Sequence, residues 1–234
     1  MKKRSKRYKE AAKSLVAEKT YTLFEAVSTL KKFPTAKFDE SVQLNFQLGI
    51  KPDQADQTVR GTAALPHGTG KNVRVLCFVK GEAEKAAREA GADYAGADEF
   101  IKKIEGGWLD FDAIVAHPDM MRDISKLGKV LGPRGLMPSP KAGTVAADVK
   151  KAIKEIKAGR VEFKNDRTGG VHVSCGKRSF TEEALFENAK ILIKAILDAK
   201  PQTTKGDYLR NVTLASTQNP GLKLRSGALS VVEK

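Results

Sequence analysis

Apolar and polar residues alternate along several segments of the chain, with the period of two that is typical of a strand with one buried face. In residues 41–48, four apolar residues alternate with the uncharged side chains of Gln43, Asn45 and Gln47. The same alternation recurs on both sides of residues 165–170, which tolerate turn geometry. This pattern predicts a β-hairpin within residues 159–174. Further strands are expected at 58–65 and 208–217.

Helical spacing accompanies these strands in the first and last parts of the chain. A first helix is expected from Tyr8 to Lys19. A second helix follows the sequence Thr22-Leu-Phe-Glu25, which fits a capping box, and it ends before Pro34. The longest predicted helix starts at a similar sequence, Ser179-Phe-Thr-Glu182, and is closed by Pro201.

Strands and helices alternate from residue 72 onward. Residues 73–79 are almost continuously apolar, as is usual for a strand covered on both faces. This succession predicts a parallel sheet between helices, whereas the Pro- and Gly-rich residues 131–144 predict an irregular loop. The expected strands are 73–79, 93–96 and 111–116, and the expected helices are 82–90, 98–104, 120–130 and 146–157.

The order of these elements predicts an α/β protein with two domains. The first part of the chain has too few strands to bury its helix, and the last part supplies the missing ones. We therefore expect a discontinuous domain of residues 1–68 and 159–234, with a strand–helix domain inserted at residues 69–158. The chain would cross between them twice, at Pro66–Gly70 and at Ala158–Gly159.

Charge narrows the class of partner. The chain has 42 Lys and Arg residues against 28 Asp and Glu, a net charge of +14, which favours a nucleic acid or another anionic surface. Aromatic residues make up only 6%, which argues against a protein that stacks many unpaired bases. The cationic arm of residues 1–9 and the excess of positive charge around the predicted hairpin favour contact with a polyanion over a merely soluble loop. The basic residues around the hairpin are Arg160, Lys164, Arg167, Lys177 and Arg178.

Motifs for other kinds of function are absent or incomplete. The segment Pro66–Lys71 is similar to a phosphate loop, but Leu65 and Asn72 stand where a glycine and a Ser or Thr are required. The glycine spacing of dinucleotide-binding loops is missing. His117 and Asp119 have no second histidine nearby, so we expect no metal site. These observations predict a protein without cofactors that is not an enzyme.

The remaining features point to the cytoplasm. Cys77 and Cys175 lie within predicted strands and are expected to be buried thiols in a reducing compartment. No apolar run approaches the ~20 residues that a membrane helix needs. The first nine residues lack the apolar core of a signal peptide. We expect a cytoplasmic protein with no membrane partner.

Several short motifs, in this order, resemble the bacterial large-subunit ribosomal protein L-one family over almost the whole chain. They are Leu48-Gly-Ile, Asp56-Gln57, Val59-Arg-Gly-Thr62, Leu65-Pro-His-Gly68, Gly132-Pro-Arg-Gly-Leu-Met-Pro138, Pro140-Lys-Ala-Gly-Thr144 and Ala158-Gly-Arg-Val-Glu-Phe163.

The resemblance implies both a fold and a function. It implies a discontinuous ferredoxin-like split β-α-β domain, with an inserted doubly wound, Rossmann-like three-layer α/β domain. It further implies a structural constituent of the large ribosomal subunit that binds large-subunit ribosomal RNA at the mobile stalk near the exit site. Other implied partners are the exit-site tRNA, whose release the family assists, and the mRNA leader of its own operon, whose translation it represses.

The family's RNA surface belongs to the terminal domain, which gives a set of candidate residues here. Phe38 is either an edge-of-core residue or a stacking contact, and the Thr217 hydroxyl either pairs with a neighbouring strand or bonds to RNA. Gln218-Asn219 stand where the family usually has Met-Gly, and Asn211 where Ser is common. The candidate RNA-binding residues are Lys37, Phe38, Asp39, Ser41, Lys164, Asn165, Asp166, Arg167, Thr168, His172, Asn211, Thr217, Gln218 and Asn219.

Three functions are compatible with the sequence. A structural RNA binder of the ribosome is favoured by the charge, the basic turn and the resemblance. A free translational repressor could use the same RNA surface. A small-molecule enzyme built on the inserted sheet is disfavoured, because the phosphate loop and the catalytic pairs are missing.

Overall fold

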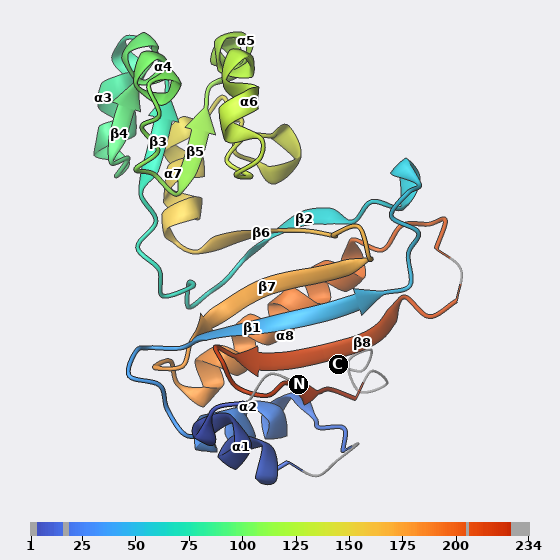
Figure 1. Ribbon diagram of the computed structural model, residues 1–234. Helices are drawn as coiled ribbons and strands as arrows, with labels where there is room; N and C mark the ends of the chain where they lie inside the picture. The colour runs from blue at the N-terminus through green and yellow to red at the C-terminus, as the bar shows by residue number, and fades with distance from the viewer. Residues whose placement is uncertain (1–3, 16–18, 205, 226–234) are drawn as a thin grey trace. The chain divides into compact units, whose positions relative to one another are not determined.

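In the computed structural model, residues 4–15, 19–204 and 206–225 are described, and the chain divides into two compact units (Figure 1). Unit 1 comprises residues 1–70 and 161–234, and unit 2 comprises residues 71–160. Both units contain helices and strands, which confirms the predicted α/β class. Residues 1–3 of the predicted arm, residues 16–18 of the predicted first helix and the tail after Arg225 lie outside the described residues.

Unit 1 contains a four-stranded sheet in the order β7-β1-β8-β9. The central strand β1 (Ser41–Leu48) is antiparallel to β7 (Gly170–Lys177) on one side and to β8 (Leu209–Ser216) on the other. A short strand that the sequence did not predict, β9 (Leu222–Lys223), extends the sheet beyond β8. The apolar side chains of β1 are buried and the alternate polar ones are not, as the period of two predicted.

Helices cover one face of this sheet. They are α2 (Leu23–Lys32) and α8 (Glu182–Asp198), whose apolar side chains share one core with the buried side chains of β1, β7 and β8. A third helix, α1 (Lys6–Lys13), adds the buried Ala11 to the same core. The predicted capping box of α2 is present, because the Thr22 hydroxyl accepts from the Glu25 amide and the Glu25 carboxylate accepts from the Thr22 amide.

The predicted cap of α8 at Ser179 is wrong. The N-cap is Thr181, whose hydroxyl accepts from the Ala184 amide. Ser179 lies two residues earlier, and its hydroxyl donates to Asp39 Oδ2 at 2.8 Å. Ser and Thr are both favourable N-cap residues, so the sequence alone did not show that Thr181 caps the helix while Ser179 bonds to the loop before β1.

The predicted hairpin is also wrong in its pairing. The strand β6 (Arg160–Lys164) pairs with β2 (Arg60–Ala64) in a separate two-stranded sheet, while β7 pairs with β1. The Asn165 side chain accepts from the Val59 amide, and the Asn165 amide donates to the Val59 carbonyl, so this residue fixes the β2–β6 pair. Alternation had predicted the two strands but carries no information on which partner each strand takes.

Unit 2 is built on a three-stranded parallel sheet in the order β4-β3-β5, with helices on both faces. The strands are β3 (Val75–Phe78), β4 (Tyr94–Gly96) and β5 (Ala113–Ala116). All four residues of β3 are buried, and they contribute alternately to two separate cores. One core includes α3 (Glu82–Glu89) and α7 (Val149–Lys157), and the other includes α4 (Asp98–Glu105).

The single helix expected at 120–130 is instead a series of short turns. These are the 3₁₀ turns η2 (Pro118–Met120) and η3 (Ser125–Leu127) and the short helices α5 (Met121–Ile124) and α6 (Gly128–Leu131). Ile124, Leu127 and Leu131 are all buried in the core beside α4. The predicted continuous helix is therefore wrong, because the 3₁₀ turn at Ser125–Leu127 and Gly128 interrupt it.

Both cysteines are free and buried, as predicted. Burial raises the pKa of the Cys77 thiol and of the Cys175 thiol to about 12, so neither is a thiolate at neutral pH. Within the described part of the chain, no helix has the length and apolar character that a bilayer crossing requires.

Candidate nucleic-acid interface

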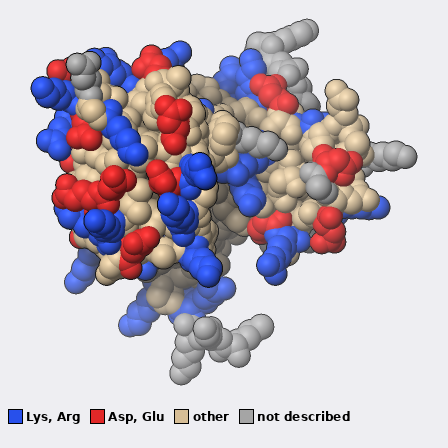
Figure 2. All heavy atoms as spheres, turned by 90° about the horizontal axis from the view of Figure 1, so that it is seen from above, with Lys and Arg blue, Asp and Glu red and all other residues tan. Residues whose placement is uncertain are grey.

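Charge does not mark a binding patch on the face of the molecule that is seen in Figure 2. On the face that Figure 2 shows, basic and acidic side chains are interspersed, although the whole chain carries a net charge of +14. The candidate interface therefore has to be built from the geometry around the predicted residues.

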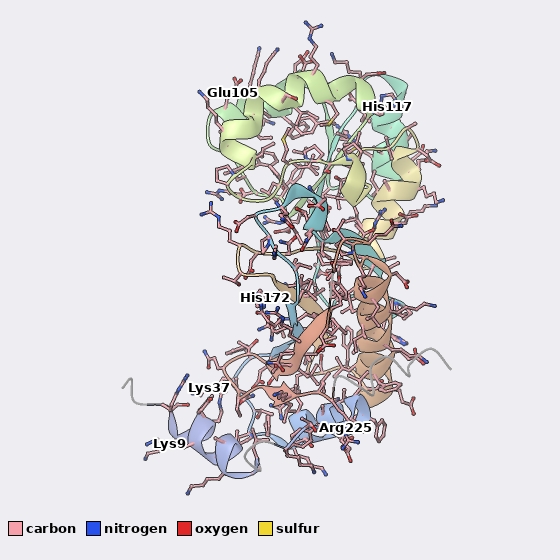
Figure 3. All side chains as sticks on the ribbon, turned by 90° about the vertical axis from the view of Figure 1, so that its right-hand side faces the viewer. Lys9, Lys37, Glu105, His117, His172 and Arg225 are labelled. Atoms are coloured by element: carbon pink, nitrogen blue, oxygen red, sulfur yellow. The ribbon has the colours of Figure 1, made fainter. Side chains whose placement is uncertain are left out.

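On the face of the unit 1 sheet opposite α2 and α8, the middle rows of β7, β1 and β8 carry no Lys, Arg, Asp or Glu, whereas Lys223 of β9 lies opposite Thr213. His172 and Lys37 lie on the side of the unit away from α8 (Figure 3). Asn45 lies between His172 on β7 and Thr213 on β8, and His172 Nδ1 is 2.9 Å from Asn45 Oδ1. The rows beside it are Ser174, Gln43 and Ala215 on one side, and Gly170, Gln47 and Asn211 on the other. These rows offer donors and acceptors without a fixed charge, which suits contacts to sugars and base edges.

The loop before β1 is held by a buried ion pair. Glu40 is 1% exposed, and its Oε1 accepts from the Ala36 amide at 2.8 Å and from Arg178 Nη1 at 3.3 Å. Arg178 also donates through Nη2 to the carbonyls of Lys31, at 2.9 Å, and Phe33, at the end of α2. A buried charge needs such partners, because desolvation would otherwise destabilise the folded state.

This arrangement corrects the expectation for two of the basic residues. Arg178 is only 9% exposed and its donors are used inside the protein. Arg160 lies with Nη1 2.7 Å from Glu155 Oε2 and is partly buried. Both guanidinium groups are thus bonded within the protein instead of standing free around a basic turn.

The loop before β1 exposes Lys37 and Phe38, and hydrogen bonds to Asp39 and Ser41 hold it next to them. The Asp39 carboxylate accepts from the amide and the hydroxyl of Ser179, and Lys177 Nζ donates to the Ser41 hydroxyl at 3.1 Å. Lys37 is exposed, and Phe38 is 51% exposed. The edge-of-core alternative for Phe38 is therefore wrong, and a stacking role stays a prediction.

The turn after β8 is hydrogen-bonded to the first residue of β1 and to Glu40 of the buried ion pair. The Thr217 hydroxyl accepts from the Ser41 amide at 3.0 Å and donates to the Ser41 carbonyl at 3.2 Å. Asn219 Nδ2 donates to Glu40 Oε2 and to the Ser216 hydroxyl, both at 2.8 Å. Among the described residues, Gln218 is the one non-glycine residue with a positive φ, 63°, and its side chain is exposed. Asn219, one of the two residues that stand where the family usually has Met-Gly, thus makes specific contacts.

At the other end of β1 lies the turn between β6 and β7. Asp166 Oδ1 accepts from the Thr168 hydroxyl, the Thr168 amide and the Gly170 amide, all within 2.8 Å. The hydrogen bond from the Thr168 side chain and those from the backbone lower the pKa of the Asp166 carboxyl. The turn is joined to β1 because Gln47 Nε2 donates to the Thr168 carbonyl. Lys164 and Arg167 remain exposed on it.

The structure sorts the predicted residues into two groups around β1. One group is held by internal hydrogen bonds and shapes the loops: Asp39, Ser41, Asn165, Asp166, Thr168, Thr217 and Asn219. The other group does not shape the loops and has exposed side chains, two of which also have a partner in the protein, His172 in Asn45 and Gln218 in Arg7: Lys37, Phe38, Lys164, Arg167, His172, Asn211 and Gln218. The two flanking loops lie at opposite ends of an eight-residue strand, roughly 24 Å apart at ~3.4 Å per residue.

Sequence reasoning missed several residues that shape this site. Glu40 and Arg178 were not candidates, because charged residues are usually exposed and their pairing joins positions 138 residues apart. Arg7 of α1 was also missed, although Nη2 donates to Gln218 Oε1 at 2.9 Å. The alternation in β1 did contain a signal for Asn45, since uncharged polar residues occupied every outward position.

The comparisons with known proteins decide the family. Residues 30–220 match the model of the Ribosomal protein L1p/L10e family. The chain belongs to this family. It is 56% identical over 220 residues to the "Large ribosomal subunit protein uL1" of Protochlamydia amoebophila, covering 94% of this chain and 93% of that protein. It is 55% identical over 224 residues to the protein of the same name in Kosmotoga olearia, covering 96% and 97%.

Membership of the Ribosomal protein L1p/L10e family confirms the resemblance predicted from the sequence. It also confirms that the protein is not an enzyme, because the relatives are ribosomal proteins. The hypothesis of a small-molecule enzyme on the parallel sheet is therefore wrong.

Thr217→Val tests whether the turn depends on the hydroxyl. The substitution leaves the Ser41 amide and carbonyl without their side-chain partner, so we expect the free energy of unfolding to fall by about 1–3 kcal/mol. Denaturant unfolding measures the change, with Thr213→Val on the open face of the same strand as the control. Equal stability of Thr217→Val and the parent protein would contradict this role.

Proposed function

We propose that this protein is a structural constituent of the large ribosomal subunit that binds large-subunit ribosomal RNA at the mobile stalk near the exit site. The surface we assign to RNA is the open face of the unit 1 sheet together with the two loops at the ends of β1. The observation that carries the proposal is the row of uncharged polar side chains across β7, β1 and β8, with exposed cations at both ends of β1. The names of the relatives place those proteins in the large ribosomal subunit, which supports the choice of RNA.

The exposed residues would contact RNA, and the internally bonded residues would keep the loops in shape. Lys37, Lys164 and Arg167 are exposed and would neutralise phosphates, which supply most of the affinity of such surfaces. Phe38 would stack on an unpaired base, and His172 and Asn211 would bond to sugars or base edges. The internally bonded residues would keep the loops in their bound shape before RNA arrives, which lowers the entropic cost of binding.

Two further roles rest on family membership. We propose contact with the exit-site tRNA during its release, and repression of the protein's own operon by binding its mRNA leader. A single RNA surface is compatible with ribosomal RNA and mRNA alike, since neither role needs a second set of residues. All of these activities would take place in the cytoplasm, on the ribosome or on free mRNA.

We also propose that the two units are domains, a discontinuous ferredoxin-like domain and an inserted doubly wound, Rossmann-like domain. The antiparallel order β7-β1-β8 with two helices on one face supports the first assignment. The parallel order β4-β3-β5 between two helical layers supports the second. The unit boundaries lie two residues from those expected from the sequence, at 70/71 and 160/161.

Removing single exposed cations tests the phosphate contacts. Lys37→Gln and Arg167→Gln should each reduce the slope of log affinity against log salt by roughly 0.7–0.9, the contribution of one neutralised phosphate. Binding to a large-subunit ribosomal RNA transcript is measured between 50 and about 200 mM salt, a range over which such contacts are strongly screened. The control is Lys190→Gln on α8, exposed on a helix of the covered face. Unchanged slopes for the first two variants would remove these loops from the interface.

Deleting unit 2 tests the domain assignment. The Asn188 side chain on α8 donates to the Gly68 carbonyl, so the deletion starts after Gly70, and a short glycine linker joins Gly70 to Val161. We expect a folded fragment that retains RNA affinity to within about tenfold, because every residue assigned to RNA lies in unit 1. Circular dichroism reports folding and filter binding reports affinity. Tight binding by isolated residues 71–160 would overturn the assignment.

A further inference from the structure

The helix α1 carries a basic stripe that the proposed interface does not yet use. Lys6, Lys9 and Lys13 follow one another at helical spacing of three and four residues, so they share one face, and all three are exposed. Ala11 lies on another face and is 1% exposed within the unit 1 core. An eight-residue helix is marginal alone, so its position depends on contacts with the rest of the protein.

One side chain ties this helix to the turn after β8. Arg7 Nη2 donates to Gln218 Oε1 at 2.9 Å, and Arg7 Nη1 lies 3.8 Å from the buried carboxylate of Glu40. Gln218 is the residue with φ of 63°, a conformation that side chains other than glycine seldom adopt. Arg7 thus joins α1 to a strained position in a turn 211 residues away, at the edge of the candidate RNA surface.

The stripe and the proposed interface lie on the same side of unit 1. Lys9 of α1, Lys37 of the loop before β1 and His172 of the sheet are all found on the side away from α8 (Figure 3). The apolar contacts of this segment with the core are small, namely Ala11 and the partly buried Leu15 just after the helix. The contacts of Arg7 with Gln218 and Glu40 hold α1 beside the turn after β8, and its three lysines stay exposed.

We propose that Arg7 is a positioning residue that docks α1 against the turn 217–219, and that Lys6, Lys9 and Lys13 of the docked helix contact phosphates of the same RNA. The inference deepens the proposed function and rests on it. It assigns Gln218, which replaces the usual Met of the family pattern, a partner within the protein. The alternative is that α1 is a solvated surface helix whose charge serves only solubility.

The first experiment measures how much Lys6, Lys9 and Lys13 contribute to the salt dependence of RNA binding. The triple variant Lys6→Gln/Lys9→Gln/Lys13→Gln should lower the slope of log affinity against log salt by about 2–3, since each neutralised phosphate contributes roughly 0.7–0.9. The probe is a large-subunit ribosomal RNA transcript. The matched control is Lys154→Gln/Lys190→Gln/Lys194→Gln, which removes the same charge from exposed positions of α7 and α8.

The second experiment tests whether Arg7 holds α1 against the turn 217–219. Arg7→Met keeps the length of the side chain but loses the guanidinium, and we expect the affinity for the transcript to fall about tenfold. In the lysine triple variant, Arg7→Met should change the affinity little, because a helix without its lysines makes no phosphate contacts that docking could support. Hydrogen exchange of the α1 amides in the free protein should accelerate in Arg7→Met, while exchange in α8 stays the same. Arg7→Lys, which retains charge but not the two-armed geometry, should restore the affinity only in part.

The outcomes separate this inference from the proposed function. A parent protein that binds the transcript, with a triple variant no different from its control, overturns the inference and leaves the proposed function standing. Equal losses for Arg7→Met in both backgrounds overturn the docking role. A parent protein that does not bind the transcript overturns the proposed function, and this inference with it.

Discussion

One buried carboxylate, Glu40, holds together the loops at one end of the candidate RNA surface. Glu40 is almost completely withdrawn from water, and a charge in that position is tolerated only when it is paired and hydrogen-bonded. Its partners come from four separate stretches: the Ala36 amide before β1, Arg178 after β7, Asn219 after β8 and Arg7 of α1. The interactions that compensate for burying Glu40 therefore also hold those stretches together. Arg178 further donates to carbonyls at the end of α2, where the helix dipole favours a positive charge.

The residues of the candidate surface have two different roles. Some hold the loops in place through internal hydrogen bonds, and others have exposed side chains that are available to RNA. Asp39, Thr217 and Asp166 use their side-chain oxygens inside the protein, and the loops they shape expose Lys37, Phe38 and Arg167. Between the loops, the sheet face carries amides, hydroxyls and one imidazole without fixed charge. A surface of this kind would obtain affinity from the cations at its ends and discrimination from the polar groups between them. Both contributions depend on loops that are ordered before binding.

Local patterns predicted most of the elements, and long-range pairing accounts for most of the errors. The alternation in β1 and the capping box at Thr22 are properties of neighbouring residues, and the structure confirms them. The partner of β6 is not such a property, because Asn165 bonds to Val59 from 106 residues away. Arg178 looked like part of a basic surface turn, since its buried partner Glu40 is distant in sequence. Motif resemblance located the loops of the site, but it could not show that Thr217 bonds to the backbone of Ser41.

The central claim, that the Glu40–Arg178 pair organises the interface, is tested most directly by a double-mutant cycle on these two residues. Arg178→Met leaves the Glu40 carboxylate buried without its cation, so we predict a loss of about 3–5 kcal/mol in the free energy of unfolding. Glu40→Gln/Arg178→Met should recover at least ~1 kcal/mol of that loss, because the stranded charge is gone. Where Arg178→Met stays folded, its affinity for the large-subunit ribosomal RNA transcript should fall about tenfold, although the side chain is only 9% exposed. Additive effects on stability, with RNA affinity unchanged in Arg178→Met, would contradict the account.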